Sequence, residues 1–202
     1  MSKWFIAGAL GLSLIADSLA QRPAPSADAM RSIEFVTDEG TWISLDVAPD
    51  GRTIAFELLG DVYGLPMAGG SAQPMLTGSA FQSQPRFSPD GRSLAFISDN
   101  TGSDNVWIAE ADGAQPRPLT SMPRSTMMSP SWSHDGRAIF VTVIDGRQAG
   151  IVRVDVASGK TEKLVANGNG AAAPLVSSPA PGPFGPEPTA DGQSLYYTSV
   201  TP

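Results

Sequence analysis

Cysteine is absent from the 202 residues of this chain. Its absence excludes disulfide bonds, a thiol nucleophile, thiolate metal ligands and a lipid anchor attached through cysteine. A protein without such cross-links has to gain its stability from buried apolar surface, which a repeated β-sheet supplies.

Histidine is nearly absent too, because His134 stands alone. A Ser-His-Asp triad or a multi-histidine metal centre has to be built around it, and zinc or di-metal hydrolysis normally uses several imidazole ligands. His134 precedes an Asp-Gly pair, where a polar residue at a solvated corner is the ordinary interpretation. The sequence also lacks a GxSxG elbow and a phosphate-binding GxxxxGK[ST] loop. We therefore predict no catalytic, cofactor-binding or metal-binding residue in this segment.

Positive charge is scarce, with 13 Lys and Arg against 20 Asp and Glu, for a net charge of −7. An acidic chain without a basic cluster is a poor partner for phosphate backbones or anionic lipid. Nucleic acid is therefore not an expected partner.

The first twenty residues have the three parts of a secretory signal. Lys3 is followed by an apolar run from Trp4 to Ala16 and by the small-residue exit Ser18-Leu19-Ala20. The run is too short to span a bilayer, and no later run is long enough to anchor the chain. We expect a signal peptide over 1–20, cleavage after Ala20, a flexible segment over 21–32 and a periplasmic or secreted protein. The alternative is that the run forms an apolar first helix of the domain.

One pattern occurs four times: an apolar strand, a turn containing Asp-Gly, and a second apolar strand. The four turn pairs are Asp50-Gly51, Asp90-Gly91, Asp135-Gly136 and Asp191-Gly192, at spacings of 40, 45 and 56 residues. Strand signals at a period of 40 to 45 residues are typical of β-propeller blades. The predicted fold is therefore an all-β propeller of four-stranded antiparallel blades, and these eight residues are predicted to form its repeated structural turns.

The second repeat defines the blade most clearly. Its expected strands are 84–88, 93–98, 105–110 and a last strand ending at 118–120, joined by short loops. The same plan places blades at about 41–77, 84–120, 130–165 and 187–202, within a propeller region over 33–202. Residues 167–186 are rich in Ala, Gly and Pro, which predicts a long mobile loop.

Three and a half blades do not close a ring, and an open ring leaves unpaired strand edges. The short strand Ile33–Val36 is a candidate for closing it. We expect the chain to be the front part of a longer protein. A self-contained four-bladed ring or an assembly of half-rings is the alternative.

Four other features have ordinary structural explanations. The oxygen-rich loop Asp99–Asp104 lacks the spacing of a calcium loop, and the glycines of 168–173 are not followed by a helix that could receive a phosphate. The methionine-rich link 122–128 is a connector or a contact surface. Nine aromatic residues fall in predicted strands and are expected to pack between blades: Trp42, Phe56, Phe87, Phe96, Trp107, Trp132, Phe140, Tyr196 and Tyr197.

The segment FSPDGRSLAFISDNTGSDNVWIAEADGAQPRPLT, residues 87–120, resembles the repeat of TolB-like propellers, also called WD40-like or PD40 repeats. The resemblance extends over about 42–199 and implies the fold more than the function. His134 and Ala190 depart from it, since the repeat has Pro at these places. Residues 38–72, DEGTWISLDVAPDGRTIAFELLGDVYGLPMAGGSA, look like the propeller that precedes metal-dependent amidohydrolase domains in exported bacterial proteins.

This resemblance implies three functions. The first is the non-catalytic propeller of an exported amidohydrolase-like enzyme, whose C–N bond hydrolysis and divalent metal belong to a region outside this chain. The second is a periplasmic TolB-like propeller that binds another protein. The third is the propeller of a prolyl-oligopeptidase-like serine peptidase. The expected partner is the protein's own C-terminal domain or a periplasmic protein.

Overall fold

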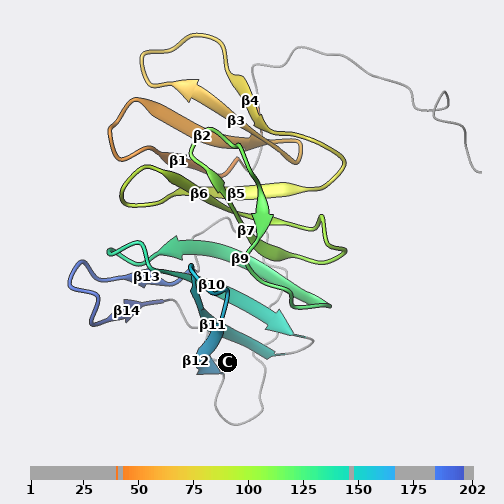
Figure 1. The fold of residues 1–202 in the computed structure, drawn as a ribbon, viewed down its shortest axis with the longest axis vertical. Helices are drawn as coiled ribbons and strands as arrows, with labels where there is room; N and C mark the ends of the chain where they lie inside the picture. Colours follow the sequence, from red (N-terminus) through yellow and green to blue (C-terminus); the bar gives the residue numbers. More distant parts are fainter. Residues whose placement is uncertain (1–39, 41–42, 146–147, 167–184, 198–202) are drawn as a thin grey trace, which may run out of the picture. The chain divides into compact units, whose positions relative to one another are not determined.

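The computed structural model describes residues 40, 43–145, 148–166 and 185–197, all within one unit over 39–202. These residues form three four-stranded antiparallel sheets and one two-stranded sheet, and they contain no helix (Figure 1). Blade 1 comprises β1 (Leu45–Val47), β2 (Thr53–Leu58), β3 (Asp61–Pro66) and β4 (Gln73–Leu76). Blade 2 comprises β5 (Gln82–Phe87), β6 (Ser93–Ser98), β7 (Asn105–Glu110) and β8 (Arg117–Pro118). Blade 3 comprises β9 (Ser125–Trp132), β10 (Ala138–Asp145), β11 (Gln148–Asp155) and β12 (Thr161–Ala166). Blade 4 is represented by β13 (Glu187–Pro188) and β14 (Leu195–Tyr196).

Each complete blade is a meander in which every strand pairs with the next one along the chain. This order and the antiparallel pairing are the architecture of a propeller blade, so the predicted fold class is confirmed. The structure shows three complete blades and a strand pair from a fourth.

The middle blade is buried on both faces, and the alternation of side chains along its strands explains how. On β6, Leu94 and Phe96 pack against blade 1, whereas Ala95 and Ile97 pack against blade 3. Neighbouring residues of one strand thus contribute to two different cores. This is why β6 has a nearly continuous apolar sequence rather than an alternating one.

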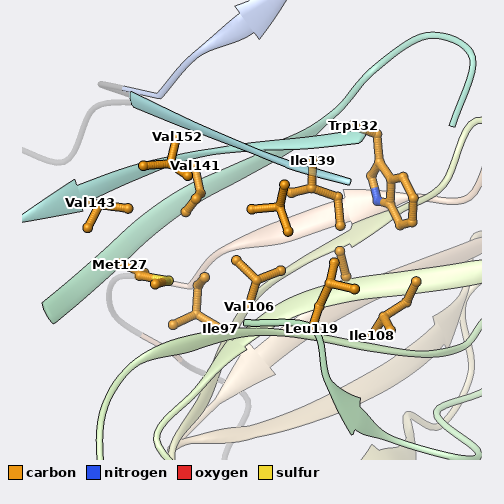
Figure 2. Close-up of a cluster of buried hydrophobic side chains, with 12 residues drawn as sticks. Ile97, Val106, Ile108, Leu119, Met127, Trp132, Ile139, Val141, Val143 and Val152 are labelled. Carbon is orange, nitrogen blue, oxygen red and sulfur yellow. The ribbon is translucent and has the colours of Figure 1, made fainter. Parts of the chain in front are cut away.

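The larger of the two cores lies between blades 2 and 3. Figure 2 shows Ile97, Val106 and Ile108 of blade 2 facing Val141 and Ile139 of blade 3. Val106, Ile139 and Val141 are fully buried, and the remaining members are almost so. Stability therefore comes from surfaces between sheets, as expected for a repeat protein without disulfide bonds.

The link between blades 2 and 3 differs from the sequence expectation. Residues 122–128 were expected to be a connector or a contact surface, but β9 begins at Ser125 and pairs with β10. Met127 is 2% exposed and belongs to the core between the blades. Its strand position was hidden because the methionine-rich segment lacks the β-branched pattern that marks the other strands.

Blade 1 has one face that packs on blade 2 and one face that no other blade covers in the described part of the chain. On the second face, Ile43, Leu45 and Val47 are 39%, 53% and 38% exposed. Phe56, which is paired with Leu45, and Tyr63 lie on the same face as a stacked pair, with ring centroids 5.8 Å apart. We call this apolar surface the uncovered face of blade 1.

Several sequence expectations lie outside the described residues. These are the signal peptide over 1–20, the segment 21–32, the strand at Ile33–Val36, Trp42, the glycines of 168–173 and most of the loop 167–186. Tyr197 was expected in a strand but follows the last residue of β14. No helix long and apolar enough to cross a membrane is present in the described part of the chain.

Candidate functional site: the turns and first strands of the blades

The four Asp-Gly pairs occupy the turns between the first and second strands of the blades. Gly51, Gly91, Gly136 and Gly192 all have φ between 67° and 69°, the left-handed conformation that glycine adopts at least cost. In blade 2 the N–H of Gly91 donates to the Ser88 carbonyl at 2.8 Å, and the Arg92 N–H donates to Asp90 Oδ1 at 3.1 Å. The aspartate thus caps the backbone of its own turn.

A hydroxyl group completes three of these turns. Ser88 Oγ donates to Asp90 Oδ1 at 2.6 Å and accepts the Ser93 N–H at 2.9 Å. Ser133 and Thr189 make the same contacts in blades 3 and 4, whereas blade 1 has Ala48 at this place.

The hydrogen bond from this hydroxyl is the largest effect that lowers the pKa of the turn carboxylates. The second largest is the hydrogen bond from the backbone N–H of the residue two positions after the aspartate. The pKa values of Asp90, Asp135 and Asp191 are all lowered in this way. The carboxylates are therefore held ionised as turn caps. A general acid would need a raised pKa instead.

The single histidine lies beside two of these turns. His134 is exposed and, with Asp90, Asp135 and Trp132, lines a cleft of about 430 Å³ between blades 2 and 3. Both carboxylates are already engaged by turn hydroxyls. In the described part of the chain, no three His, Cys, Asp or Glu residues come together as a metal site. The arrangement is that of a polar surface cleft rather than a triad.

The loop Asp99–Asp104 uses its polar groups for its own structure. Asp99 Oδ1 accepts the Phe81 N–H at 2.8 Å, and Asn105 Nδ2 donates to Thr101 Oγ1 at 3.1 Å. Burial, followed by repulsion from Asp99, raises the pKa of Asp104. Asp99, Thr101 and Asn105 thus have hydrogen-bond partners within the protein, as expected for a structural loop.

A row of equivalent residues, each in or just before the first strand of its blade, joins successive blades. Ser44, Gln84, Ser129 and Gly185 stand at the same place in the four repeats, 40, 45 and 56 residues apart. The Gln84 N–H donates to Ser44 Oγ at 3.0 Å and to Glu57 Oε2 at 2.8 Å, and the Ser129 N–H donates to Gln84 Oε1. Gly185 continues the row, because a Cβ atom there would lie 2.3 Å from Ser129 Cβ.

Sequence analysis missed this row, although a signal was present. Gln84, Ser129 and Gly185 each precede a proline, and Gln84 and Ser129 have a positive φ of 55°. This local twist turns their N–H groups away from their own sheet and towards the preceding blade. The repeated Xaa-Pro pair at the spacing of the Asp-Gly pairs would have identified these three members of the row, although not Ser44, which precedes Leu45.

Two residues further along, the first strands carry a second polar row: Asp46, Arg86, Ser131 and Glu187. Asp46 Oδ2 accepts the Phe87 N–H at 2.8 Å, and Arg86 Nη1 donates to the Leu45 carbonyl at 3.1 Å. Ser131 Oγ donates to Glu187 Oε2 at 3.3 Å. Both rows therefore connect neighbouring blades through hydrogen bonds. Their partially exposed polar groups are the candidate contact surface of the domain.

Comparison with known proteins agrees with this architecture. Residues 29–181 match the family described as PD40, TolB beta propeller domain. The uncharacterized peptidase YuxL of Bacillus subtilis is 33% identical over 129 residues, which are 58% of this chain and 19% of the relative. The Tol-Pal system protein TolB of Coxiella burnetii is 39% identical over 70 residues, which are 33% of this chain and 15% of the relative. The chain thus spans less than a fifth of the length of these two relatives.

Among solved structures, a putative TolB from Agrobacterium tumefaciens superposes with a TM-score of 0.59 at 23% identity. The superposition covers 76% of this chain and 52% of the other. At this identity the likeness shows the fold alone. The family match extends over most of the sequence and coincides with the repeated four-stranded blades, and on that ground the chain belongs to the TolB beta propeller (PD40) family.

Proposed function

We propose that this chain is the non-catalytic propeller of an exported hydrolase that acts on C–N bonds, and that the reacting groups belong to a region outside these residues. The observation that carries the proposal is the likeness to YuxL, a protein named as a peptidase, of whose length this chain spans only 19%. A repeat domain that forms so small a share of a hydrolase is suited to support or gate a catalytic domain.

The hydrogen bonds of the polar side chains favour a structural role for the propeller. The aspartates of three turns accept hydrogen bonds from turn hydroxyls, and the row Ser44, Gln84 and Ser129 joins each blade to the next. These groups already have structural partners within the propeller. The uncovered face of blade 1 adds exposed apolar surface of the kind that polypeptide interfaces bury.

Two hydrolase classes fit the proposal. The resemblance of residues 38–72 favours a metal-dependent amidohydrolase, whereas the YuxL relative favours a peptidase, in which a serine nucleophile is the alternative to a metal. Inhibition of the purified native protein separates them. A chelator abolishes the activity of the metal enzyme, and a fluorophosphonate abolishes that of the serine enzyme.

The intact mass of the protein in its native host is the first test. An antibody against blade 2 and mass spectrometry should detect a species much larger than the 21.0 kDa of this chain. The same spectra would show whether the mature N-terminus is Gln21, as export with cleavage after Ala20 requires. A mature species slightly below 21.0 kDa would refute the hydrolase proposal.

Binding of another protein is the second candidate function, and the likeness to the Coxiella TolB favours it. Loops and first strands held on a rigid propeller provide a natural docking surface. A pull-down from the native cell envelope should then recover one stoichiometric protein partner. Recovery of the propeller alone would count against this candidate.

A further inference from the structure

The turn between β2 and β3 carries a leucine that both turn geometry and exposure disfavour. Only Leu59 and Gly60 join the two strands, because Leu58 pairs with Asp61. Both turn residues have a positive φ, 56° and 88°, as in a type I′ turn, where Asn-Gly is the favoured pair. The left-handed conformation is costly for leucine because of its Cβ atom. Leu59 is also 75% exposed, the largest exposed fraction of any large hydrophobic side chain among the described residues. Neither the turn nor burial therefore accounts for a leucine at this place.

Phe81 extends the apolar surface of this turn. The loop between β4 and β5 brings it there, and the Gln82 N–H donates to the Gly60 carbonyl at 2.8 Å. A Cβ atom on Gly60 would lie 2.8 Å from Phe81 Cδ2, so the aromatic ring lies against the turn. Phe81 is itself 55% exposed. We call Leu59 and Phe81 the apolar tip. A single exposed apolar residue is common, whereas two held together at one turn form a patch suited to contact with another molecule.

Hydrogen bonds from blades 1 and 2 hold the apolar tip in place. Asp99 Oδ1, at the end of β6, accepts the Phe81 N–H at 2.8 Å. Asp61 Oδ1, at the start of β3, accepts the Gly78 N–H at 3.2 Å. The backbone that carries Phe81 is thus fixed on both sides before any partner binds. Such preorganisation reduces the entropy that a binding surface loses on association.

The same two aspartates decide which partner fits. Asp61 and Asp99 place negative charge at the border of the apolar tip, on a chain whose net charge is −7. A second copy in a symmetric contact would bring the same carboxylates against these, and like charges across an interface repel. A partner with Lys or Arg next to its apolar side chains has the complementary charge.

We propose that the apolar tip is a docking site for a polypeptide segment that presents apolar side chains flanked by Lys or Arg. The apolar side chains of the segment cover Leu59 and Phe81, and its cations lie beside Asp61 and Asp99. The strained turn then keeps a leucine for binding rather than for folding. The site is independent of the proposed hydrolase function, since it needs no catalytic domain.

The test titrates the ¹⁵N-labelled protein with the peptide acetyl-Lys-Leu-Lys-Leu-Lys-amide and follows assigned backbone amide signals. Those of Leu59 and Gly60 should shift saturably, with a Kd of about 0.1–1 mM for so short a peptide. The signal of Met67, which follows the other end of β3, should not move. Glutamate in place of the peptide lysines, or serine in place of its leucines, should weaken binding roughly five-fold or more.

Leu59→Asn separates a binding role from a structural one. Asparagine adopts the left-handed conformation more easily, so the Tm of this variant should rise by about 2–4 °C. Its Kd for the lysine-leucine peptide should nevertheless increase roughly five-fold. Met67→Gln is the matched control, because it replaces an apolar side chain that is 46% exposed at the other end of the same strand. This control should leave the Kd unchanged.

Four results would overturn the proposal. The first is an absence of shifts at Leu59 and Gly60 with the lysine-leucine peptide. The second is equal binding of the glutamate or the serine peptide. The third is a lower Tm of Leu59→Asn, which would mean that the leucine serves the fold. The fourth is a concentration-dependent dimer in sedimentation that Leu59→Asn abolishes, because a second copy would then cover the apolar tip. None of these measurements uses enzymatic activity, so failure here leaves the hydrolase proposal untouched.

Discussion

Ile139 and Ile54 occupy the same place in two repeats but face different surroundings. Ile139 is fully buried between blades 2 and 3, whereas Ile54 is half-buried on the uncovered face of blade 1. Ile139→Ala removes three buried carbon groups, worth about 2.4 kcal/mol at about 0.8 kcal/mol each. The remaining cavity raises the expected loss in unfolding free energy to about 3–4 kcal/mol.

Ile54→Ala is the matched control, because it makes the same chemical change on a face that no other blade covers among the described residues. Its expected cost is less than about 1.5 kcal/mol, since part of the side chain is in water already. Urea unfolding of both variants, followed by tryptophan fluorescence, gives the two free energies. Equal losses would refute the reasoning, because they would mean that Ile54 is as deeply packed as Ile139.

Three further predictions concern the turns and a loop. Ser88→Ala should cost about 1 kcal/mol in urea unfolding, because it removes a turn hydroxyl with two hydrogen bonds, whereas Ala48→Ser should cost nothing; equal effects would contradict this. Asp104→Asn should raise the Tm at pH 7 but not near pH 3. Burial raises the pKa of Asp104, so the folded state favours the protonated carboxyl group. This stabilisation is present below the unfolded pKa and is lost as the pH rises through the folded pKa; a gain in Tm that does not depend on pH would refute the prediction. Gly113→Ala should cost more than about 2 kcal/mol, since its Cβ would lie 2.4 Å from a backbone oxygen of blade 1. Gly51→Ala, with open space around it, should cost about 1 kcal/mol, and similar losses in thermal unfolding would contradict the contact.

Much of the fold was predictable because each blade repeats one local pattern. The expected strand Ser93–Ser98 coincides with β6, and the expected strand at 105–110 coincides with β7. Their apolar runs are bounded by turn residues on both sides, which defines the ends of a strand. Where such boundaries are weak, the bounds differ: β5 begins at Gln82, two residues before the expected start.

The candidate site was less predictable, because its residues gain their roles from other blades. Gln84 looks like an ordinary strand residue, yet its N–H binds Ser44 and its side chain accepts the N–H of Ser129. Trp107 was expected to pack between blades, and it does so, but its unpaired N–H depends on what blade 1 places opposite it. No pattern within one repeat contains this information.

The sequence by itself determined the blade, since its turns depend on neighbours only. Asp90 caps its own turn and Gly91 supplies the left-handed conformation, and both effects act within a few residues. The tertiary structure decided which surfaces meet: it buried Ile139, left the equivalent Ile54 at the surface, and packed Trp107 into the core between blades 1 and 2. The physical reason is that burial and hydrogen-bond pairing across blades join residues some 40 positions apart, and a repeated sequence places the same residue type in positions with different neighbours.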